Sequence, residues 1–352
     1  MRIIMKKIMP IILSLAIVLT FSACTSSKSE TPADSELTAE SELTAESEVI
    51  SEPEVISEPE VTSESEISAE SSEESGTRVV NTVMGDIEIP ANPQRVVVNW
   101  YIGDTLATGL NIVGYYGWMQ KTMPFYDQMM ASTKIENWEQ EEVMALEPDL
   151  IITYSKEDYE TFSQVAPVLV IEESIKSPER TRIIGEATGT LETAEKTITA
   201  FETKLKNAKE IFNTEAFKGK TFSILEDWGS SGEWAGLSYE TGSRGGTLLY
   251  TYLEQQYPDK LRELIETSGN GRGTISYEVA HEYFGDYIIW CRQEGTESEY
   301  AQSDIWKSIP AVADGHVLEI PGEYQGLFYF DDVLSLEAQL DYLVEALNTL
   351  VD

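Results

Sequence analysis

The feature that most constrains this chain is a long stretch, Leu191–Phe212, which contains neither glycine nor proline and is rich in Ala, Glu and Lys. Such a composition predicts one continuous helix, about 33 Å long at 1.5 Å per residue. On each side of it, short apolar runs alternate with helical patterns, which is typical of parallel sheets covered by helices. The sequence therefore predicts an α/β fold of two lobes, each with a mostly parallel sheet, joined by one long α-helix.

Each side of this helix carries its own predicted strands. Apolar runs predict them at 95–99, 112–116, 149–154 and 168–171 before the helix, and at 221–225, 273–276, 287–290 and 316–320 after it. Helical patterns follow at 246–255, 278–284 and 334–350. Met84-Gly85-Asp86 predicts a hairpin turn. We therefore divide the folded part into an N-terminal lobe at 77–188, a bridging helix at 189–213 and a C-terminal lobe at 214–352.

The N-terminal residues have the pattern of an export signal. A basic start is followed by an apolar run of about 14 residues, shorter than the about 20 that a spanning helix needs. The run ends in Phe21-Ser22-Ala23-Cys24, which resembles the lipobox of bacterial lipoproteins. The resemblance implies a lipoprotein signal peptide at 1–23 and a lipid on the sulfur of Cys24. Ordinary signal cleavage next to an incidental cysteine is the alternative.

Residues 24–76 predict an acidic, disordered tether. Six consecutive hexads at 35–70 place an apolar residue only about every sixth position, which matches neither a helix nor a strand. Dense negative charge with low hydrophobicity favours disorder and extension. The segment is therefore expected to act as a solvated spacer, with a binding repeat as the alternative.

Composition excludes several classes of protein. The chain has 62 acidic and 24 basic residues and a formal net charge of −38, so it is not expected to bind nucleic acid. Its two cysteines exclude a disulfide-stapled scaffold, and its two histidines argue against a multi-histidine metal centre. No cofactor is expected.

The two predicted lobes also echo each other in sequence. Glu141 precedes Asp149 by eight residues, and an apolar strand follows; Glu278 precedes Asp286 by the same spacing, again before an apolar strand. Each pair is typical of a short surface helix opened by an acid and followed by a buried strand. One such match could also arise by chance.

Several stretches together resemble one family, the iron-siderophore substrate-binding lipoproteins of ABC importers, of the ferric hydroxamate type. In the first half these are IPANPQRVVV, GDTLATGLNIVGY, EEVMALEPDLIITYS, VAPVLV and RIIGEATG; in the second they are RGGTLLY, GDYIIW, WKSIPAVADGHVLEI and YFDDVLSLEAQLDYL. The resemblance covers nearly all of 86–350. It implies a periplasmic-binding-protein class with two Rossmann-like lobes joined by a single bridging helix. It also implies that a ferric siderophore is held between the lobes, the iron being bound by the siderophore and not by the protein.

The resemblance also implies partners. In the family, an acid on each lobe docks on basic residues of the membrane permease, and the matching positions are Glu141 and Glu278. The expected partners are therefore an ABC permease with its ATPase and the membrane, through lipidated Cys24, on the outer face of the cytoplasmic membrane. A monomer is expected. The alternative for both acids is a favourable charge at a helix N-terminus.

Aromatic side chains in predicted loops are the candidates for ligand contact. Ligands of open α/β sheets bind beyond the carboxyl ends of strands, and loop aromatics hold a bulky ligand at low entropy cost. The predicted ligand-binding residues are Trp100, Tyr101, Trp118, Trp228, Trp234, Tyr239, Arg244, Phe328 and Tyr329. Core packing is the alternative for any single tryptophan.

Arg244 is the strongest single candidate. Ser243-Arg244-Gly245-Gly246 resembles the Arg-Gly-Gly of ferric-hydroxamate binders, which implies that Arg244 reaches the iron-bound hydroxamate oxygens. A guanidinium suits such clustered acceptors. The few candidate cations favour a neutral or cationic ferric hydroxamate over a trianionic catecholate. The alternative is an arginine paired with a nearby acid.

Three other functions remain open from the sequence. The same family includes haem and cobalamin binders, and Met119, Met123 and Tyr126 could supply an axial haem ligand. A secreted hydrolase is more distant, because no nucleophile–histidine–acid set and no G-x-S-x-G motif is evident. The chain is therefore not expected to be an enzyme.

Overall fold

The computed structural model describes residues 76–232 and 235–351, and their strands form a hairpin and two five-stranded sheets. The hairpin pairs β1 (Thr77–Thr82) with β2 (Gly85–Pro90) in antiparallel register. Gly85 has φ 96°, a left-handed conformation that glycine adopts at no steric cost. The predicted hairpin turn at this glycine is therefore confirmed.

The first lobe is built on an all-parallel sheet. Its strand order is β5 (Thr133–Lys134), β4 (Ile112–Tyr116), β3 (Val96–Asn99), β6 (Leu150–Thr153), β7 (Val168–Val170). Every residue of β3, β6 and β7 is buried, as expected for strands covered on both faces. Its helices are α1 (Ile102–Ala107), α2 (Tyr126–Met129), α3 (Gln140–Met144), α4 (Lys156–Phe162) and α5 (Glu179–Thr188).

The second lobe is built on a mixed sheet. Its strand order is β10 (Arg272–Ile275), β9 (Leu237–Glu240), β8 (Phe222–Asp227), β11 (Tyr287–Cys291), β12 (Val317–Ile320). Strands β8, β11 and β12 run parallel, whereas β9 is antiparallel to both of its neighbours. Around it lie α7 (Asp259–Ser268), α8 (Tyr277–Ala280), α9 (Asp304–Ser308), α10 (Pro310–Ala313), α11 (Val333–Val351), the π-helix η1 (Thr247–Tyr252) and the 3₁₀ turns η2 (His281–Tyr283), η3 (Tyr300–Gln302) and η4 (Gly322–Tyr324).

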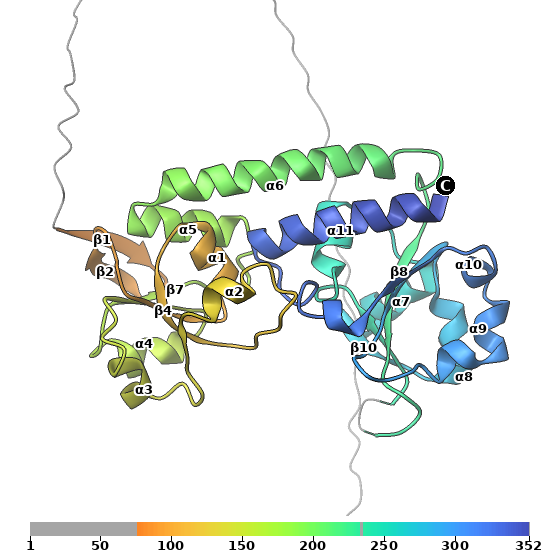
Figure 1. Cartoon of the computed structure of the whole chain (residues 1–352), viewed down its shortest axis with the longest axis horizontal. Helices are drawn as coiled ribbons and strands as arrows, with labels where there is room; N and C mark the ends of the chain where they lie inside the picture. The colour runs from red at the N-terminus through yellow and green to blue at the C-terminus, as the bar shows by residue number, and fades with distance from the viewer. Residues whose placement is uncertain (1–75, 233–234, 352) are drawn as a thin grey trace, which may run out of the picture. The chain divides into compact units, whose positions relative to one another are not determined.

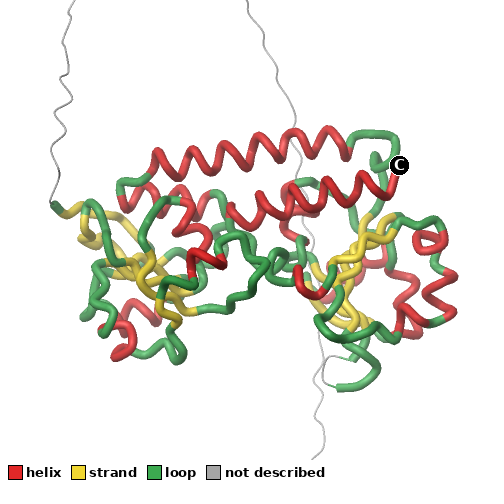
Figure 2. The backbone as a smooth tube through the Cα atoms, viewed as in Figure 1, coloured by secondary structure: helices red, strands yellow, loops and turns green. Residues whose placement is uncertain are grey.

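One helix, α6 (Leu191–Phe212), connects the two sheets and has the predicted bounds. Its buried residues recur every three or four positions and form a single apolar stripe: Ala194, Ile198, Phe201, Ala208 and Phe212. Through it α6 packs on α5 and on α11, and Figure 1 shows it running past both sheets. The strands form two separate groups in Figure 2, one in each lobe. The predicted α/β fold of two lobes joined by one long helix is confirmed.

Four apolar clusters form the core, two for each sheet. In the second lobe, the cluster under α11 also takes in Phe201 and Phe212 of α6. In the first lobe, Phe330 and Leu334, which are distant in sequence, pack on the cluster around α1 and β3. Apolar contacts of α6 and of the start of α11 therefore join the two lobes.

The structure contains elements that the sequence analysis did not predict. These include α7, strand β9 and α9, of which β9 and α9 are short. Strand β9 lies in a polar, glycine-rich region where apolar alternation is weak. The helical pattern predicted at 246–255 is a six-residue π-helix, η1, and the one at 278–284 is α8 followed by a 3₁₀ turn. Short elements depend on their neighbours more than on local propensity.

Several predictions fall outside the described residues: the signal peptide at 1–23, Cys24, the tether at 24–76 apart from its last residue, and Trp234. The proposed domain boundaries at 188–189 and 213–214 stay predictions. Within 76–232 and 235–351, no helix combines the length and the apolar character needed to cross a bilayer.

Candidate functional site

Aromatic side chains from both lobes meet at one place. Trp100 follows β3 and Trp118 follows β4, while Tyr329 lies between β12 and α11. The ring centroids of Trp118 and Tyr329 are 4.6 Å apart, and those of Trp100 and Tyr329 are 6.3 Å apart. All three side chains are half-buried. Three of the predicted ligand residues therefore form one cluster across the two lobes.

Arg244 of the second lobe adjoins this cluster. Its Cζ lies 5.8 Å from the centroid of the Tyr329 ring, and its Nε donates a hydrogen bond of 3.1 Å to Oε2 of Glu226. Arg244 is 6% exposed and Glu226 is fully buried. Burial raises the pKa of Glu226, and the positive charge of Arg244 opposes that rise. The sequence left open the alternative that Arg244 is paired with a nearby acid. The structure contains such a pair, between Arg244 and Glu226.

Trp100 and Arg244 share an unusual backbone conformation. Their φ angles are 64° and 59°, in the left-handed region that non-glycine residues seldom adopt. Such residues persist where the surrounding structure imposes them, and they gather at functional sites. The glycines after Arg244 permit its turn: a Cβ on Gly246 would lie 2.4 Å from the backbone of Thr241, and Gly245 itself has φ 86°.

Two loops meet beside the aromatic cluster. Thr122 Oγ1, in the loop after β4, donates a hydrogen bond of 2.7 Å to the carbonyl of Glu323 in η4. The backbone N–H of Gly326 donates to the side-chain oxygen of Gln120. A Cβ on Gly326 would lie 2.6 Å from that oxygen and 2.8 Å from Cβ of Gln120, so a larger residue would displace the Gln120 side chain. The second lobe therefore contacts the first through backbone groups of one loop.

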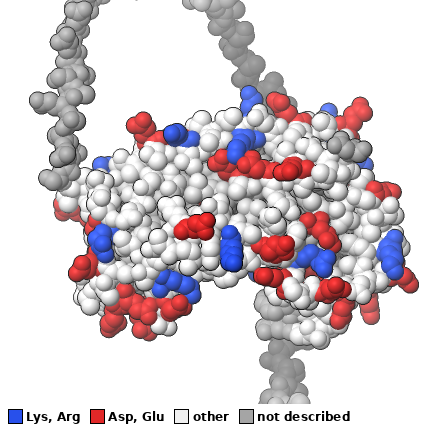
Figure 3. All heavy atoms as spheres, in the orientation of Figure 1, with Lys and Arg blue, Asp and Glu red and all other residues white. Residues whose placement is uncertain are grey.

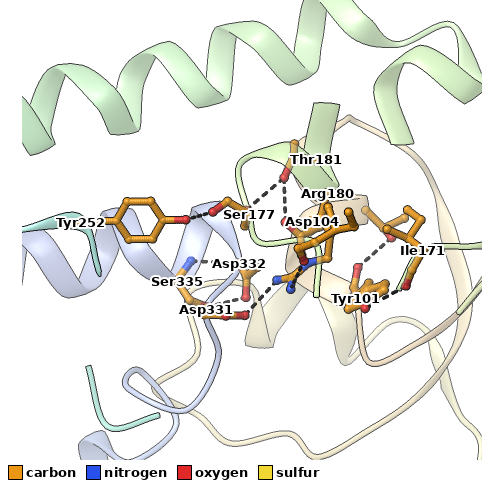
Figure 4. Close-up of polar contacts among 12 residues, drawn as sticks. Tyr101, Asp104, Ile171, Ser177, Arg180, Thr181, Tyr252, Asp331, Asp332 and Ser335 are labelled. Atoms are coloured by element: carbon orange, nitrogen blue, oxygen red, sulfur yellow. Dashed lines mark hydrogen bonds and ion pairs between the residues drawn. The ribbon is translucent and has the colours of Figure 1, made fainter. Parts of the chain in front are cut away.

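A second connection between the lobes is a buried ion cluster, shown in Figure 4. Arg180 of α5 donates from Nε to Asp104 of α1 over 2.6 Å and from Nη2 to Asp331 over 2.9 Å. Asp104 also accepts a hydrogen bond of 2.7 Å from Thr181. Asp331 lies just before α11, so this arginine ties the start of α11 to α1 and α5.

Asp332 is the most strongly perturbed carboxyl of this cluster. It is 3% exposed, and its carboxyl group accepts hydrogen bonds from the backbone N–H and the hydroxyl of Ser335. Asp332 thereby caps the start of α11. Its carboxyl group packs against Gly103, where a Cβ would lie 2.0 Å from Oδ1. Burial, and then the negative charge of Asp104, raise the pKa of Asp332 to about 7.

Two cavities flank Trp100. One, of about 350 Å³, is lined by Tyr101, Tyr154 and Phe330 and by residues of the ion cluster, Arg180 and Asp331 among them. The other, of about 500 Å³, is lined by first-lobe residues that include Trp118, Tyr126 and Met130. Both volumes fall within the range of small-molecule sites. Charged side chains, among them Glu173 and Lys176, make up much of the wall of the smaller cavity, whereas aromatic and apolar side chains make up most of the wall of the larger one. The larger cavity therefore suits the apolar surface of a bulky ligand, and the smaller one suits polar groups.

The remaining predicted ligand residues lie elsewhere. Tyr101 lines the smaller cavity but is 7% exposed, and its hydroxyl donates to the carbonyl of Ile171 over 3.0 Å. Trp228 is half-buried between β8 and β9. The predicted loop position of Tyr239 is wrong: Tyr239 lies in β9, is 3% exposed and packs in the core, because an unpredicted strand forms there. Phe328 is buried in the core as well, against Tyr342.

The two acids predicted to dock occupy equivalent positions. Glu141 lies in the first turn of α3 and Glu278 in the first turn of α8, and both are exposed. In the view of Figure 1, α3 and α8 lie on the side away from α6. Figure 3 shows acidic side chains gathered over the end of the first lobe that carries α3.

Other candidate chemistry is not supported by the geometry. Among the described residues, no group of three or more His, Cys, Asp or Glu side chains could hold a metal ion. His316 stacks on Tyr287 at 4.5 Å, and its Nδ1 lies 3.2 Å from the carbonyl oxygen of Asp286, so its surroundings are those of a packed side chain. Cys291 is buried, and burial raises the pKa of its thiol.

Sequence reasoning missed Glu226, Gln325 and the Arg180–Asp331 pair. Glu226 stands in the strand run FSILED, where a charged residue among apolar neighbours is the available signal. Such a residue is rarely buried without a partner. No local pattern identifies that partner, because Arg244 is 18 residues away and Gln325 is 99 residues away.

Comparison with known proteins gives consistent matches. A family model described as a periplasmic binding protein matches residues 120–324. The iron(3+)-hydroxamate-binding protein FhuD of Bacillus subtilis is 31% identical over 276 residues, covering 75% of this chain and 84% of that protein. Together these matches confirm the resemblance seen in the sequence motifs.

Two solved structures are also similar. A FhuD-fold periplasmic binding protein component of a Fep/Fec-like ferrichrome ABC transporter from Bacillus subtilis shares 29% identity and a TM-score of 0.64, covering 76% of this chain and 99% of that one. FhuD2 from Staphylococcus aureus with bound ferrioxamine B shares 25% identity and a TM-score of 0.62, covering 74% and 100%. These similar proteins are binding proteins and not enzymes, and the ferric siderophore is their ligand.

Proposed function

Because this chain belongs to the periplasmic binding protein family, we propose that it captures a ferric siderophore of the hydroxamate type between its two lobes and delivers it to an ABC permease. Membership of the family supports a location outside the cytoplasm and a role in transport. The identity of the cargo and its delivery are the proposed steps. The iron would stay wrapped in its chelator, which is the cargo.

The observation that supports this function most directly is the meeting of Trp100, Trp118 and Tyr329 with the guanidinium of Arg244. The rings offer flat apolar contact to the aliphatic body of a siderophore. The guanidinium offers charge-assisted hydrogen bonds to oxygens that already bind iron. The relative FhuD is named for iron(3+)-hydroxamate binding, and FhuD2 has been solved with ferrioxamine B, which supports this class of ligand.

The local charge favours a ligand without a large negative charge. Arg244 is already paired with Glu226, and Arg180 is paired with Asp104 and Asp331. A ferric tris-catecholate carries about three negative charges and needs several unpaired cations to offset them. A neutral or cationic ferric hydroxamate needs none.

Delivery would use the exposed acids of the two lobes and an anchor at the N-terminus. Glu141 and Glu278, at equivalent places on α3 and α8, would meet basic residues of the permease and set the orientation of docking. A lipid on Cys24 would keep the protein at the outer face of the membrane, close to the permease and its ATPase.

Fluorescence titration tests the cargo. Ferrioxamine B, ferrichrome and a ferric tris-catecholate are titrated separately into the purified protein, and the quenching of tryptophan emission is followed. We expect the two hydroxamates to bind at least about 10-fold more tightly than the catecholate. Tightest binding of the catecholate would contradict the proposal, and a Soret band after addition of haemin would identify a haem binder instead.

Transport measurements test docking. The double variant Glu141→Ala and Glu278→Ala is expected to bind ferric hydroxamate normally but to support little uptake in cells, because the orienting charges are removed. The matched control is Glu160→Ala with Glu263→Ala, which removes an acid from α4 and one from α7. Normal uptake by the first double variant would show that these acids do not dock.

A further inference from the structure

Glu226 is a fully buried acid that the sequence analysis did not single out. It lies in β8, one residue before the end of the strand, and none of its surface is exposed. Within the described residues its hydrogen-bond partners are two: Nε of Arg244 at 3.1 Å and Nε2 of Gln325 at 3.2 Å. A buried carboxylate needs such partners, and here they come from two separate loops of the second lobe.

The contact with Arg244 is made on one edge of the guanidinium. Among the described residues, Nε is the only nitrogen of this guanidinium that donates a hydrogen bond. Guanidinium has five N–H donors in a rigid fork, so bonding at Nε fixes the plane and leaves the Nη groups for a ligand. Glu226 therefore decides which way the fork of Arg244 points.

Glu226 also balances the charge beside the aromatic cluster. Glu226 forms an ion pair with Arg244. A second ion pair joins Arg272 to the buried Glu240, with Nε of Arg272 2.9 Å from Oε1 of Glu240. Ser243, next to Arg244, donates to the other oxygen of Glu240 over 3.1 Å. Two acids and two bases thus cancel, and a ligand at Arg244 meets hydrogen-bond donors without a net positive charge.

The contact with Gln325 links Arg244 to the loop that meets the first lobe. Gln325 stands between Glu323, whose carbonyl accepts from Thr122, and Gly326, whose N–H donates to Gln120. Glu226 therefore contacts at once the candidate ligand-binding arginine and the segment through which the lobes touch.

We propose that Glu226 is a positioning and specificity residue: it orients the guanidinium of Arg244 and cancels its charge, so that the site selects ferric complexes without net negative charge. This role rests on the proposed function, since it presupposes a ferric siderophore at Arg244. Removing the negative charge while keeping the shape would leave Arg244 as a net cation facing the ligand. Anionic complexes would then gain affinity relative to neutral and cationic ones.

The test compares Glu226→Gln with Glu226→Asp and with wild type. The ligands are ferrioxamine B, ferrichrome and a ferric tris-catecholate, and the readout is the ratio of hydroxamate to catecholate affinity. We expect Glu226→Gln to lower this ratio about 10-fold or more. Glu226→Asp keeps the charge but shortens the side chain, so it is expected to weaken all ligands while preserving the ratio.

Asp227→Asn is the matched control. Asp227 is the neighbouring buried acid on β8, but it accepts hydrogen bonds from Ser298 and from the backbone of Gly229 and Tyr300 and makes no ion pair with Arg244 in the described residues. Asp227→Asn removes a buried negative charge from the same strand without removing the partner of Arg244. We expect the affinity ratio of this variant to equal that of wild type, and an equal fall of the ratio in both variants would overturn the role.

The wild-type protein supplies a second measurement in case Glu226→Gln does not fold. If the charge of Arg244 is cancelled, binding of the catecholate should change less than about 3-fold when salt is raised across the range that screens surface charge. A strong loss of affinity with salt would overturn the role. If wild type binds none of the three complexes, the proposed function fails and this role with it; if it binds them and Glu226→Gln leaves the ratio unchanged, the role alone fails.

Discussion

The two lobes use the same device to hold their central strands in place. In the first lobe, Asp149 accepts hydrogen bonds from the backbone N–H groups of Gln94, at 2.7 Å, and Arg95, at 2.9 Å, just before β3. In the second lobe, Asp286 accepts from the backbone N–H and the hydroxyl of Thr221, both at 2.8 Å, just before β8. Asp149 directly precedes β6, which pairs with β3, and Asp286 directly precedes β11, which pairs with β8. Each aspartate therefore joins the starts of two neighbouring strands, and this shared structural role accounts for the similar spacing in the sequence.

The lobes differ in how their strands are connected, and this changes what each brings to the site. The all-parallel first sheet places Trp100 and Trp118 directly after β3 and β4. In the second sheet the antiparallel strand β9 follows β8, and Arg244 in the turn after β9 folds back to Glu226 on β8. The first lobe therefore supplies the two tryptophans of the aromatic cluster, and the second supplies Tyr329 together with a balanced charged pair. The common sheets carry stability, and the connections carry the chemistry.

The largest expected effect lies where the two lobes join, at Asp332. Its pKa is raised from 3.8 to about 7, so the folded state favours the protonated carboxyl. This contribution to stability is complete below about pH 4 and is lost as the pH rises to about 7 and above, with a total on the order of 4 kcal/mol. Asp332→Asn should therefore be more stable than wild type at pH 8 and should not show this loss between pH 4 and pH 8.

Denaturant unfolding at several pH values measures this difference. The groups that face Asp332 are Asp104 of α1, Arg180 of α5 and Ser335 of α11. The matched control is Asp331→Asn, which is expected to lower stability at pH 8 because it breaks the ion pair with Arg180. If the free energy of unfolding of Asp332→Asn falls with rising pH as steeply as that of wild type, the Asp332 carboxyl is not the group responsible for the loss of stability.

The second prediction tests whether the shared device is equally important in both lobes. Asp149→Ala and Asp286→Ala are each expected to lower the free energy of unfolding by about 3 kcal/mol, because charge-assisted bonds to backbone N–H groups are lost. Burial by itself would raise the pKa of Asp286, but the hydrogen bonds from Thr221 hold this pKa below its ordinary value. The contribution of Asp286 to stability is therefore present at neutral pH and is lost only in acid, below about pH 4. A large loss in one variant and none in the other would mean that the lobes are alike only in sequence.

The third prediction concerns the difference between the lobes at the site. Arg244→Gln is expected to weaken ferric-hydroxamate binding by about 10- to 100-fold, because charge-assisted hydrogen bonds are lost while a donor for Glu226 is kept. Trp118→Ala is expected to weaken it by only about 5-fold, since one ring contributes a smaller contact. Fluorescence titration from the remaining tryptophans measures both, and a larger loss for Trp118→Ala would reverse the assigned roles of the lobes.

Much of the fold follows from local patterns in the sequence. The bounds of α6 were predictable because 22 residues lack any helix breaker and bury every third or fourth side chain. The fully buried strands β6 and β11 were predictable because parallel strands covered on both faces are continuous apolar runs. Strand β9 was not, because its four residues become buried only through pairing with β8 and β10.

The candidate site was predictable in its residue types but not in its geometry. The sequence identified Trp100, Trp118, Tyr329 and Arg244, which the structure brings together, but it also included Tyr239 and Phe328, which the structure buries in the core. An aromatic residue near a strand end can face a cavity or the core, and its sequence neighbours do not distinguish the two. Contact of these side chains with a siderophore stays a prediction.

The sequence by itself determined two α/β lobes, one stiff helix between them and the family to which they belong, because helix propensity, apolar periodicity and motif order are local properties. Only the tertiary structure decided that Arg244 pairs with Glu226 and that Arg180 joins Asp104 to Asp331. These partners are up to 151 residues apart in the chain. Their contact depends on how two separately formed sheets pack against common helices, and no local pattern encodes that packing.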